Sequence, residues 1–172
     1  SDSEMVWAPA RMFIPISNSD EIGVVGPQLR FFNFQTQILG TGEWQDPTEL
    51  DQHRQYVDGV IFSTDSDWDE KDQLFKLFMA KFQKAQKKKP TKNTLYGYDA
   101  MMVLLSVIRK GASHKNEIAS NLSMVQDYKG IHSKISFVEK RVNSFFAILQ
   151  YRGRLTRKIS EIDISVRPAQ TP

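Results

Sequence analysis

The residues best suited to chemistry in this sequence are polar or aromatic side chains that follow apolar runs. Two such runs cover residues 12–16 and 37–40. The candidates that come after them are Ser17, Asn18, Ser19, Glu43 and Trp44. Together they offer hydroxyl, amide, carboxylate and indole groups, which suit a small polar or zwitterionic ligand because they can pair with its charged ends. The alternative is structural: residues 17–19 cap a helix and Trp44 packs in the core.

Patterns for catalysis, metals and cofactors each lack a residue that the chemistry needs. Residues 40–45 begin like a dinucleotide-binding glycine motif, but Gln45 stands where the third glycine is required. A calcium-loop pattern that starts at Asp65 has Glu70 in place of the glycine at its sixth position, so an acidic helix start explains it better. The three histidines are far apart in the sequence, and there is no cysteine. We therefore expect no enzyme activity, no cofactor and no bound metal.

Charge is distributed unevenly along the 172 residues, although the formal net charge is only +3. Residues 1–72 hold 14 acidic and 4 basic side chains, whereas residues 73–128 hold 3 acidic and 10 basic ones. Such a split has two interpretations. In one, the chain binds an acidic partner or a nucleic acid; in the other, its oppositely charged segments attract each other in the fold or belong to different bodies. The lysines of residues 84–92 have no interleaved aromatic residues, which favours a solvated helix end. We therefore expect no nucleic-acid partner.

Alternating strands and helices must position these candidate residues. Apolar segments predict strands over 12–16, 37–40 and 57–63, with helices over about 22–32 and 48–56 between them. This order implies parallel pairing and an α/β fold. Because ligands bind outside the carboxyl ends of parallel strands, the candidate groups are expected at one edge of the sheet.

The rest of the chain changes from helical spacing to alternation. Three helices are predicted, over 67–89, 95–110 and 118–125. The side chains of the second helix expected to face inward are Tyr98, Met101, Met102, Leu105 and Ile108. Alternation then predicts a β-hairpin over 135–151 with its turn at 139–142, and an edge strand over 155–164.

The order of these segments resembles that of type I periplasmic binding proteins, in particular the leucine/isoleucine/valine-binding branch used by ABC transporters. The segments that carry the resemblance are MFIPIS, EIGVVGPQLRFFNFQTQILGTGEW, YVDGVIFS, YGYDAMMVLLSVIRKG and YKGIHSKISFVEKRVNSFFAILQYRGR, which together span about residues 10–155. The family's first half has no counterpart in this chain, so the resemblance covers only the C-terminal portion.

The resemblance implies a partial clamshell with a three-stranded hinge. The expected fold is a three-layer α/β sandwich with a parallel sheet and a C-terminal β-hairpin. Residues 1–65 would form the strand–helix–strand portion of the second lobe, and residues 66–130 a helical segment returning to the first lobe. Residues 131–172 would form the hairpin and a basic tail.

Site residues are implied in the same way. The loop 17–19 and the turn 42–44 match the ligand-facing loops of the second lobe. Glu43 lies at or next to the position of the carboxylate that holds a ligand's ammonium group. The residues expected at the hinge crossings are Phe62, Asp65 and Tyr96.

The implied function is non-catalytic binding of a small ligand such as an amino acid, outside the cytoplasm, in an ABC transport or sensory system. The implied partner is the membrane permease, reached through a full-length protein. The family's first half normally supplies loops that hold a ligand carboxylate, so this chain is not expected to supply a complete site. A rival hypothesis is an assembly module with a vestigial site, in which open sheet edges pair with a second copy as a homodimer.

Overall fold

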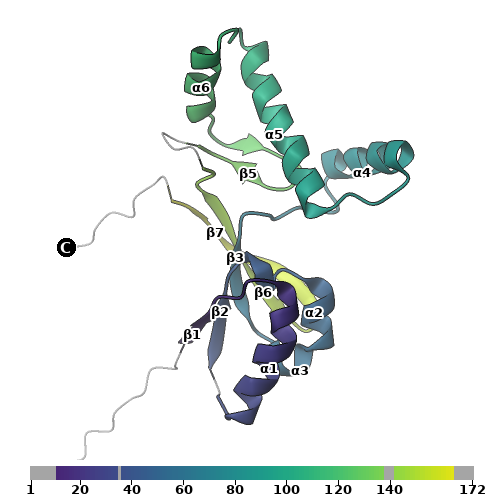
Figure 1. Ribbon diagram of the computed structural model, residues 1–172, viewed down its shortest axis with the longest axis vertical. Coiled ribbons are helices and arrows are strands. Elements are labelled where there is room, and N and C mark those ends of the chain that lie inside the picture. Colours follow the sequence, from purple (N-terminus) through teal and green to yellow (C-terminus); the bar gives the residue numbers. More distant parts are fainter. Residues whose placement is uncertain (1–10, 35, 138–141, 165–172) are drawn as a thin grey trace, which may run out of the picture. The chain divides into compact units, whose positions relative to one another are not determined.

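The computed structural model describes residues 11–34, 36–137 and 142–164. The chain divides into two compact units (Figure 1). The sheet unit comprises residues 1–64 and 147–161, and the helical unit comprises residues 65–146 and 162–172. The chain therefore passes between the units three times.

The main sheet has five strands in the order β1 (Arg11–Ile14), β2 (Gln37–Gly40), β3 (Ile61–Thr64), β6 (Phe145–Arg152) and β7 (Leu155–Asp163). The first three strands are parallel, as predicted, and β6 runs antiparallel to β3. The α/β class is thus confirmed, with a mixed sheet that is parallel where the candidate residues lie.

Short helices connect the parallel strands in the sheet unit. They are η1 (Ser19–Glu21), α1 (Ile22–Phe31), η2 (Gly42–Trp44), α2 (Pro47–Gln52) and α3 (Arg54–Val57). The core of this unit joins residues from the helices, β2, β3 and β6, and its most buried members include Ile22, Trp44, Leu50, Val57, Phe62 and Tyr151. Tyr151 follows the alternation of β6, in which every second side chain is buried.

The helical unit contains three longer helices and a small two-stranded sheet. Its elements are α4 (Gln73–Gln86), α5 (Lys92–Arg109), α6 (Lys115–Ser123), β4 (Tyr128–Lys129) and β5 (Lys134–Ile135). The acidic segment at 67–70 predicted an earlier start for α4 than the structure shows. Asp72 caps the helix, since its Oδ1 accepts hydrogen bonds from the backbone N–H of Leu74 at 2.8 Å and of Phe75 at 3.3 Å. No helix among the described residues is both long and apolar enough to cross a membrane.

The buried face of α5 differs from the predicted one. Leu95, Asp99, Val103 and Val107 are buried, whereas Tyr98, Met101 and Ile108 are exposed. Both faces of this helix carry apolar residues, so helical spacing alone does not choose between them. The choice is made by a loop at residues 130–133 that packs on Asp99.

The C-terminal hairpin also differs in its strands. β5 pairs with β4, and β6 pairs with β3, so the predicted pairing within 135–151 is wrong. The hairpin is formed by β6 and β7, which are joined by a two-residue turn at Gly153 and Arg154, both with positive φ. The predicted edge strand over 155–164 is confirmed as β7. Most of the predicted turn at 139–142 lies outside the described residues.

Candidate functional site

The candidate site lies at the carboxyl edge of β1, β2 and β3. Because these strands are parallel, the segments that follow them meet at this edge. Ser19, after β1, donates a hydrogen bond from Oγ to Oδ2 of Asp46 at 3.0 Å. Asp46 also caps α2, since its Oδ1 accepts from the backbone N–H of Thr48 at 2.9 Å and of Glu49 at 3.1 Å. One carboxylate therefore fixes both the loop after β1 and the start of α2.

A second hydrogen bond joins the turn after β2 to β1. Trp44 is fully buried, and its indole Nε1 donates to the carbonyl oxygen of Ile14 at 3.0 Å. The indole lies against Gly40, where any Cβ would overlap the ring. Of the two roles considered for Trp44, the structure therefore shows the packing one. Its ring supports the turn that carries Glu43 without being accessible to a ligand.

The third strand is tied to the same turn. Thr64, at the end of β3, is buried and donates from Oγ1 to Oε1 of Gln45 at 2.7 Å. Thr41, at the start of the turn, has a buried hydroxyl with no hydrogen-bond partner among the described residues. Contacts from both neighbouring strands thus hold the turn in place. The Thr41 hydroxyl could form a further hydrogen bond, because it makes none with the described residues.

Glu43 differs from the other polar side chains of this edge. It is exposed, and its carboxylate has no hydrogen bond or ion pair with any residue that the structure describes. Ser17 and Asn18 are also exposed. Their loop is held by Glu21, whose Oε1 accepts from the backbone N–H of Ser17 at 3.2 Å and from Nδ2 of Asn18 at 3.3 Å. This edge therefore presents a free carboxylate together with exposed hydroxyl and amide groups.

The three expected hinge residues fall in different surroundings. Phe62 is buried in the core of the sheet unit, two residues before the chain leaves that unit. Asp65 and Tyr96 belong to the helical unit, where the Tyr96 hydroxyl donates to Oδ1 of Asp65 at 2.8 Å. The rings of Tyr96 and His132 meet edge to face, with centroids 4.5 Å apart. Asp65, Tyr96 and His132, but not Phe62, line a mostly apolar cavity of about 450 Å³ within the helical unit.

A buried polar cluster in the helical unit was not predicted from the sequence. Asp99, only 1% exposed, accepts from the backbone N–H of Ile131 at 2.9 Å and of His132 at 3.0 Å. It is also hydrogen-bonded to Nδ1 of His132. Gly130 passes so close that a Cβ there would overlap the Asp99 carboxylate. The one sequence signal for this cluster is an aspartate within the apolar segment YGYDAMM.

An ion pair at the surface of the helical unit lies at the start of α4. Nζ of Lys129 lies 2.6 Å from Oδ2 of Asp72. This hydrogen bond, together with the backbone N–H of Phe75, lowers the pKa of the Asp72 carboxyl below its ordinary value. Burial raises the pKa of Tyr128, and the Asp99 carboxylate adds to that effect. No group of three or more possible metal ligands occurs in the described part of the chain.

Comparison with solved structures identifies the fold. A leucine-binding protein, LivK, from Thermotoga maritima has 20% sequence identity and a TM-score of 0.62, over 90% of this chain and 45% of that chain. The branched-chain amino acid substrate-binding protein LivJ from Streptococcus pneumoniae, solved with isoleucine, has 17% identity and a TM-score of 0.55, over 88% and 43%. A solute-binding protein of an ABC transporter from R. palustris, solved with benzoate, has 15% identity and a TM-score of 0.56, over 88% and 42%.

These likenesses establish the type I periplasmic binding protein fold that the sequence predicted. The chain spans less than half the length of the solved structures it matches. No family model matches the sequence. No curated protein matches it significantly either.

Proposed function

We propose that this chain is a non-catalytic binding module whose sheet edge forms one side of a site for a small zwitterionic ligand such as an amino acid. The observation that carries the proposal is the exposed Glu43 carboxylate, which has no partner among the described residues and stands at the carboxyl edge of a parallel sheet. The solved proteins of the same fold include complexes with isoleucine and benzoate, which are small ligands of a related size.

Each residue of the edge has a distinct role in this proposal. Glu43 pairs with the ligand's ammonium group, because a charge-assisted hydrogen bond is the strongest contact that the edge can offer. Ser17 and Asn18 contribute polar contacts from their exposed side chains. Ser19 instead positions the loop, since its hydroxyl already donates to Asp46. Trp44 supports the turn from within the core.

The rest of the proposed system lies beyond this chain. Groups that bind the ligand's carboxylate come from a second α/β portion, and a membrane permease of an ABC transporter receives the ligand outside the cytoplasm. Closure occurs at the three chain crossings, of which the first lies between Phe62 and Asp65 and the others at residues 146–147 and 161–162. The ligand favours closure because its affinity differs between the open and closed states.

A titration followed by amide NMR tests the proposal directly. We expect L-leucine, added up to about 20 mM, to shift the amide signals of Ser17, Asn18 and Glu43, because one side of a site is expected to bind in the millimolar range. The substitution Glu43→Gln should abolish these shifts. The matched control Glu70→Gln removes an exposed carboxylate of the helical unit and should leave them unchanged. Absence of shifts at these three amides with leucine, and with a panel of other amino acids, would refute the proposal.

The rival function is assembly through the outer strands of the sheet. β7 is exposed along residues 155–162, and Leu155, Ile159 and Ile162 are exposed apolar residues on it. An exposed outer strand with apolar side chains is a template for pairing with a second copy. Analytical ultracentrifugation distinguishes the two functions, because assembly requires a concentration-dependent dimer that Ile159→Lys weakens and leucine does not affect.

A further inference from the structure

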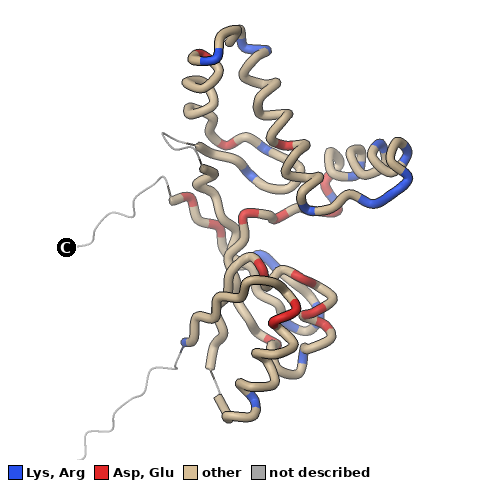
Figure 2. Tube along the Cα trace, viewed as in Figure 1, with Lys and Arg blue, Asp and Glu red and all other residues tan. Residues whose placement is uncertain are grey.

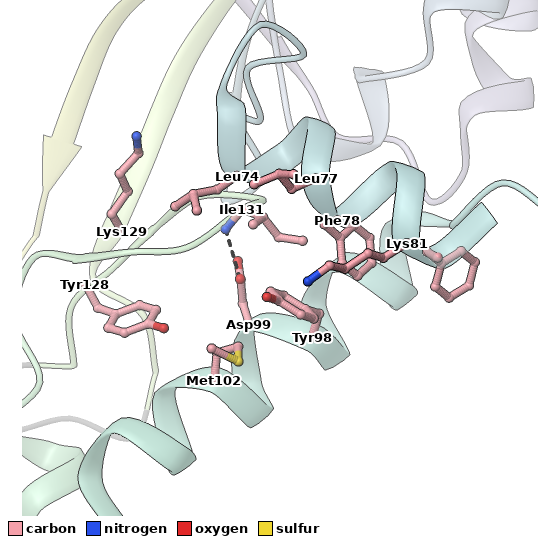
Figure 3. Close-up of a pocket in the computed structure, with 11 residues that line it drawn as sticks. Leu74, Leu77, Phe78, Lys81, Tyr98, Asp99, Met102, Tyr128, Lys129 and Ile131 are labelled. Atoms are coloured by element: carbon pink, nitrogen blue, oxygen red, sulfur yellow. Dashed lines mark hydrogen bonds between the residues drawn. The ribbon is translucent and has the colours of Figure 1, made fainter. Parts of the chain in front are cut away.

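The helical unit has an apolar groove between α4 and α5 that the proposed ligand site does not use. Its volume is about 440 Å³. Its lining is mostly apolar and includes Leu74, Leu77, Phe78, Phe82, Tyr98 and Met102, and its charged members are Lys81, Asp99 and Lys129. Figure 3 shows Leu77, Phe78 and Lys81 of α4 facing the same space as Tyr98 and Met102 of α5. Leu74 and Leu77 are 52% and 51% exposed, so the groove is open to a partner.

Aromatic contacts shape the floor of this groove. Phe78 lies with its ring centroid 4.6 Å from that of Tyr98 and 5.7 Å from that of Phe82. Because these rings are packed against each other, they give the groove a fixed apolar wall. Met102 adds an unbranched side chain that adapts to the shape of a bound residue.

The segment that contains α4 and the start of α5, which forms one wall of the groove, is strongly positive. Residues 73–98 contain no aspartate or glutamate. They contain seven lysines: Lys76, Lys81, Lys84, Lys87, Lys88, Lys89 and Lys92. Figure 2 shows them in blue along α4 and the connection to α5. Lys81 lines the groove itself and has no ion pair or hydrogen bond with any described residue, so its charge is available to a partner.

We propose that this groove binds an amphipathic helix rich in aspartate and glutamate from another protein. Leucine or phenylalanine residues at helical spacing fill the groove between α4 and α5, and acidic residues beside them pair with Lys81 and the neighbouring lysines. Charge complementarity selects an acidic partner and accelerates its association. A polynucleotide fits less well, because the groove is apolar and its aromatic rings are packed on each other and not free to stack on bases. An anionic membrane fits less well, because the apolar residues line a recess instead of projecting.

Fluorescence anisotropy with a labelled synthetic peptide tests this proposal. The probe is an amphipathic helix of about five turns, with leucines at i, i+4 and i+7 and glutamates on the opposite face. A scrambled peptide of the same composition is the control, and we expect it to bind at least about tenfold more weakly because its leucines do not share one face. Vesicles with and without phosphatidylserine and a short DNA duplex are tested in parallel. Equal binding of both peptides, or binding of vesicles or DNA without binding of the peptide, would overturn the proposal.

Two variants locate the binding. Lys81→Glu reverses a charge in the groove and should weaken peptide binding by roughly five- to tenfold, more at low salt than at high salt. Leu77→Ser removes an exposed apolar contact and should weaken it by roughly fivefold. Lys115→Glu, an exposed lysine at the start of α6, is the matched control and should have no effect. Circular dichroism checks that each variant is folded, and unchanged affinity of either groove variant would place the binding elsewhere and refute the proposal.

Discussion

Replacing Asp99 by alanine should destabilise the helical unit more than any other single loss of a carboxylate in it. Asp99 is almost fully buried in α5 and accepts hydrogen bonds from the backbone N–H groups of Ile131 and His132. It is also hydrogen-bonded to Nδ1 of the His132 ring. The substitution leaves both backbone N–H groups without this acceptor. Ile131 and His132 are 8% and 6% exposed, so water replaces the carboxylate poorly.

The size of the effect follows from these contacts. Each buried N–H that loses its acceptor costs about 1–3 kcal/mol, and the lost contact to the imidazole adds to this. We therefore expect Asp99→Ala to lower the free energy of unfolding by about 3–5 kcal/mol, a large part of the stability of a small domain. Asp99→Asn keeps one acceptor oxygen in the same place and should cost about half as much.

Urea denaturation followed by tryptophan fluorescence measures this loss. Trp68 packs against the cluster that contains Ile131, so its fluorescence reports on the region around the loop. Glu70→Ala is the control, because Glu70 is exposed, and its effect should stay within about 0.5 kcal/mol. If Asp99→Ala costs less than about 1 kcal/mol, the buried hydrogen bonds do not hold the loop to α5 and the reasoning is wrong.

Two further predictions concern the turn after β2 and the start of α4. Gly40→Ala should destabilise the sheet unit by about 1–3 kcal/mol in thermal denaturation, because the new Cβ overlaps the Trp44 indole. The hydrogen bond from this indole to Ile14 holds the ring in place. An unchanged melting temperature would show that the ring can move. The Asp72 carboxyl should titrate below the ordinary value of an aspartate in NMR, and Lys129→Met should raise its pKa. Because the pKa of Asp72 is lower in the folded state than in the unfolded state, this carboxylate stabilises the fold at a pH above its unfolded-state pKa, and the stabilisation is lost as the pH falls through its folded-state pKa. If Lys129→Met leaves the pKa of Asp72 unchanged, the ion pair is not the cause of the lowered pKa.

The fold of the sheet unit is predictable because its elements are local and regular. The alternation of apolar runs and helical spacing gives β1, α1 and β2 with nearly the observed bounds, and parallel pairing follows from the helix between the strands. The partner of β6 is not predictable in the same way. Its alternation shows that one face is buried but not which strand lies beside it, and β3 is more than 80 residues away in the sequence.

The place of the candidate residues in the fold is predictable from the sequence, but their hydrogen bonds are not. Strand order places residues 17–19 and Glu43 at the same edge of the sheet. The hydrogen bonds between Ser19 and Asp46 and between Thr64 and Gln45 are long-range contacts, which no local pattern shows. Asp46 does carry a local signal, since an aspartate before proline with Glu49 three residues later is typical of a helix start.

The hydrogen bonds at the sheet edge separate the residues that build the site from those that can bind. Ser19 and Thr64 donate to Asp46 and Gln45, so these contacts fix the loop after β1 and the turn after β2 before any ligand arrives. A loop that is already ordered loses less entropy on binding, and more of the contact energy then contributes to affinity. Glu43 is carried on this fixed turn, yet its carboxylate is exposed and has no partner in the described part of the chain. An exposed charge on a turn that is already held in place is the arrangement that the proposed role of Glu43 requires, because a buried or paired carboxylate would first have to leave its partner to meet a ligand.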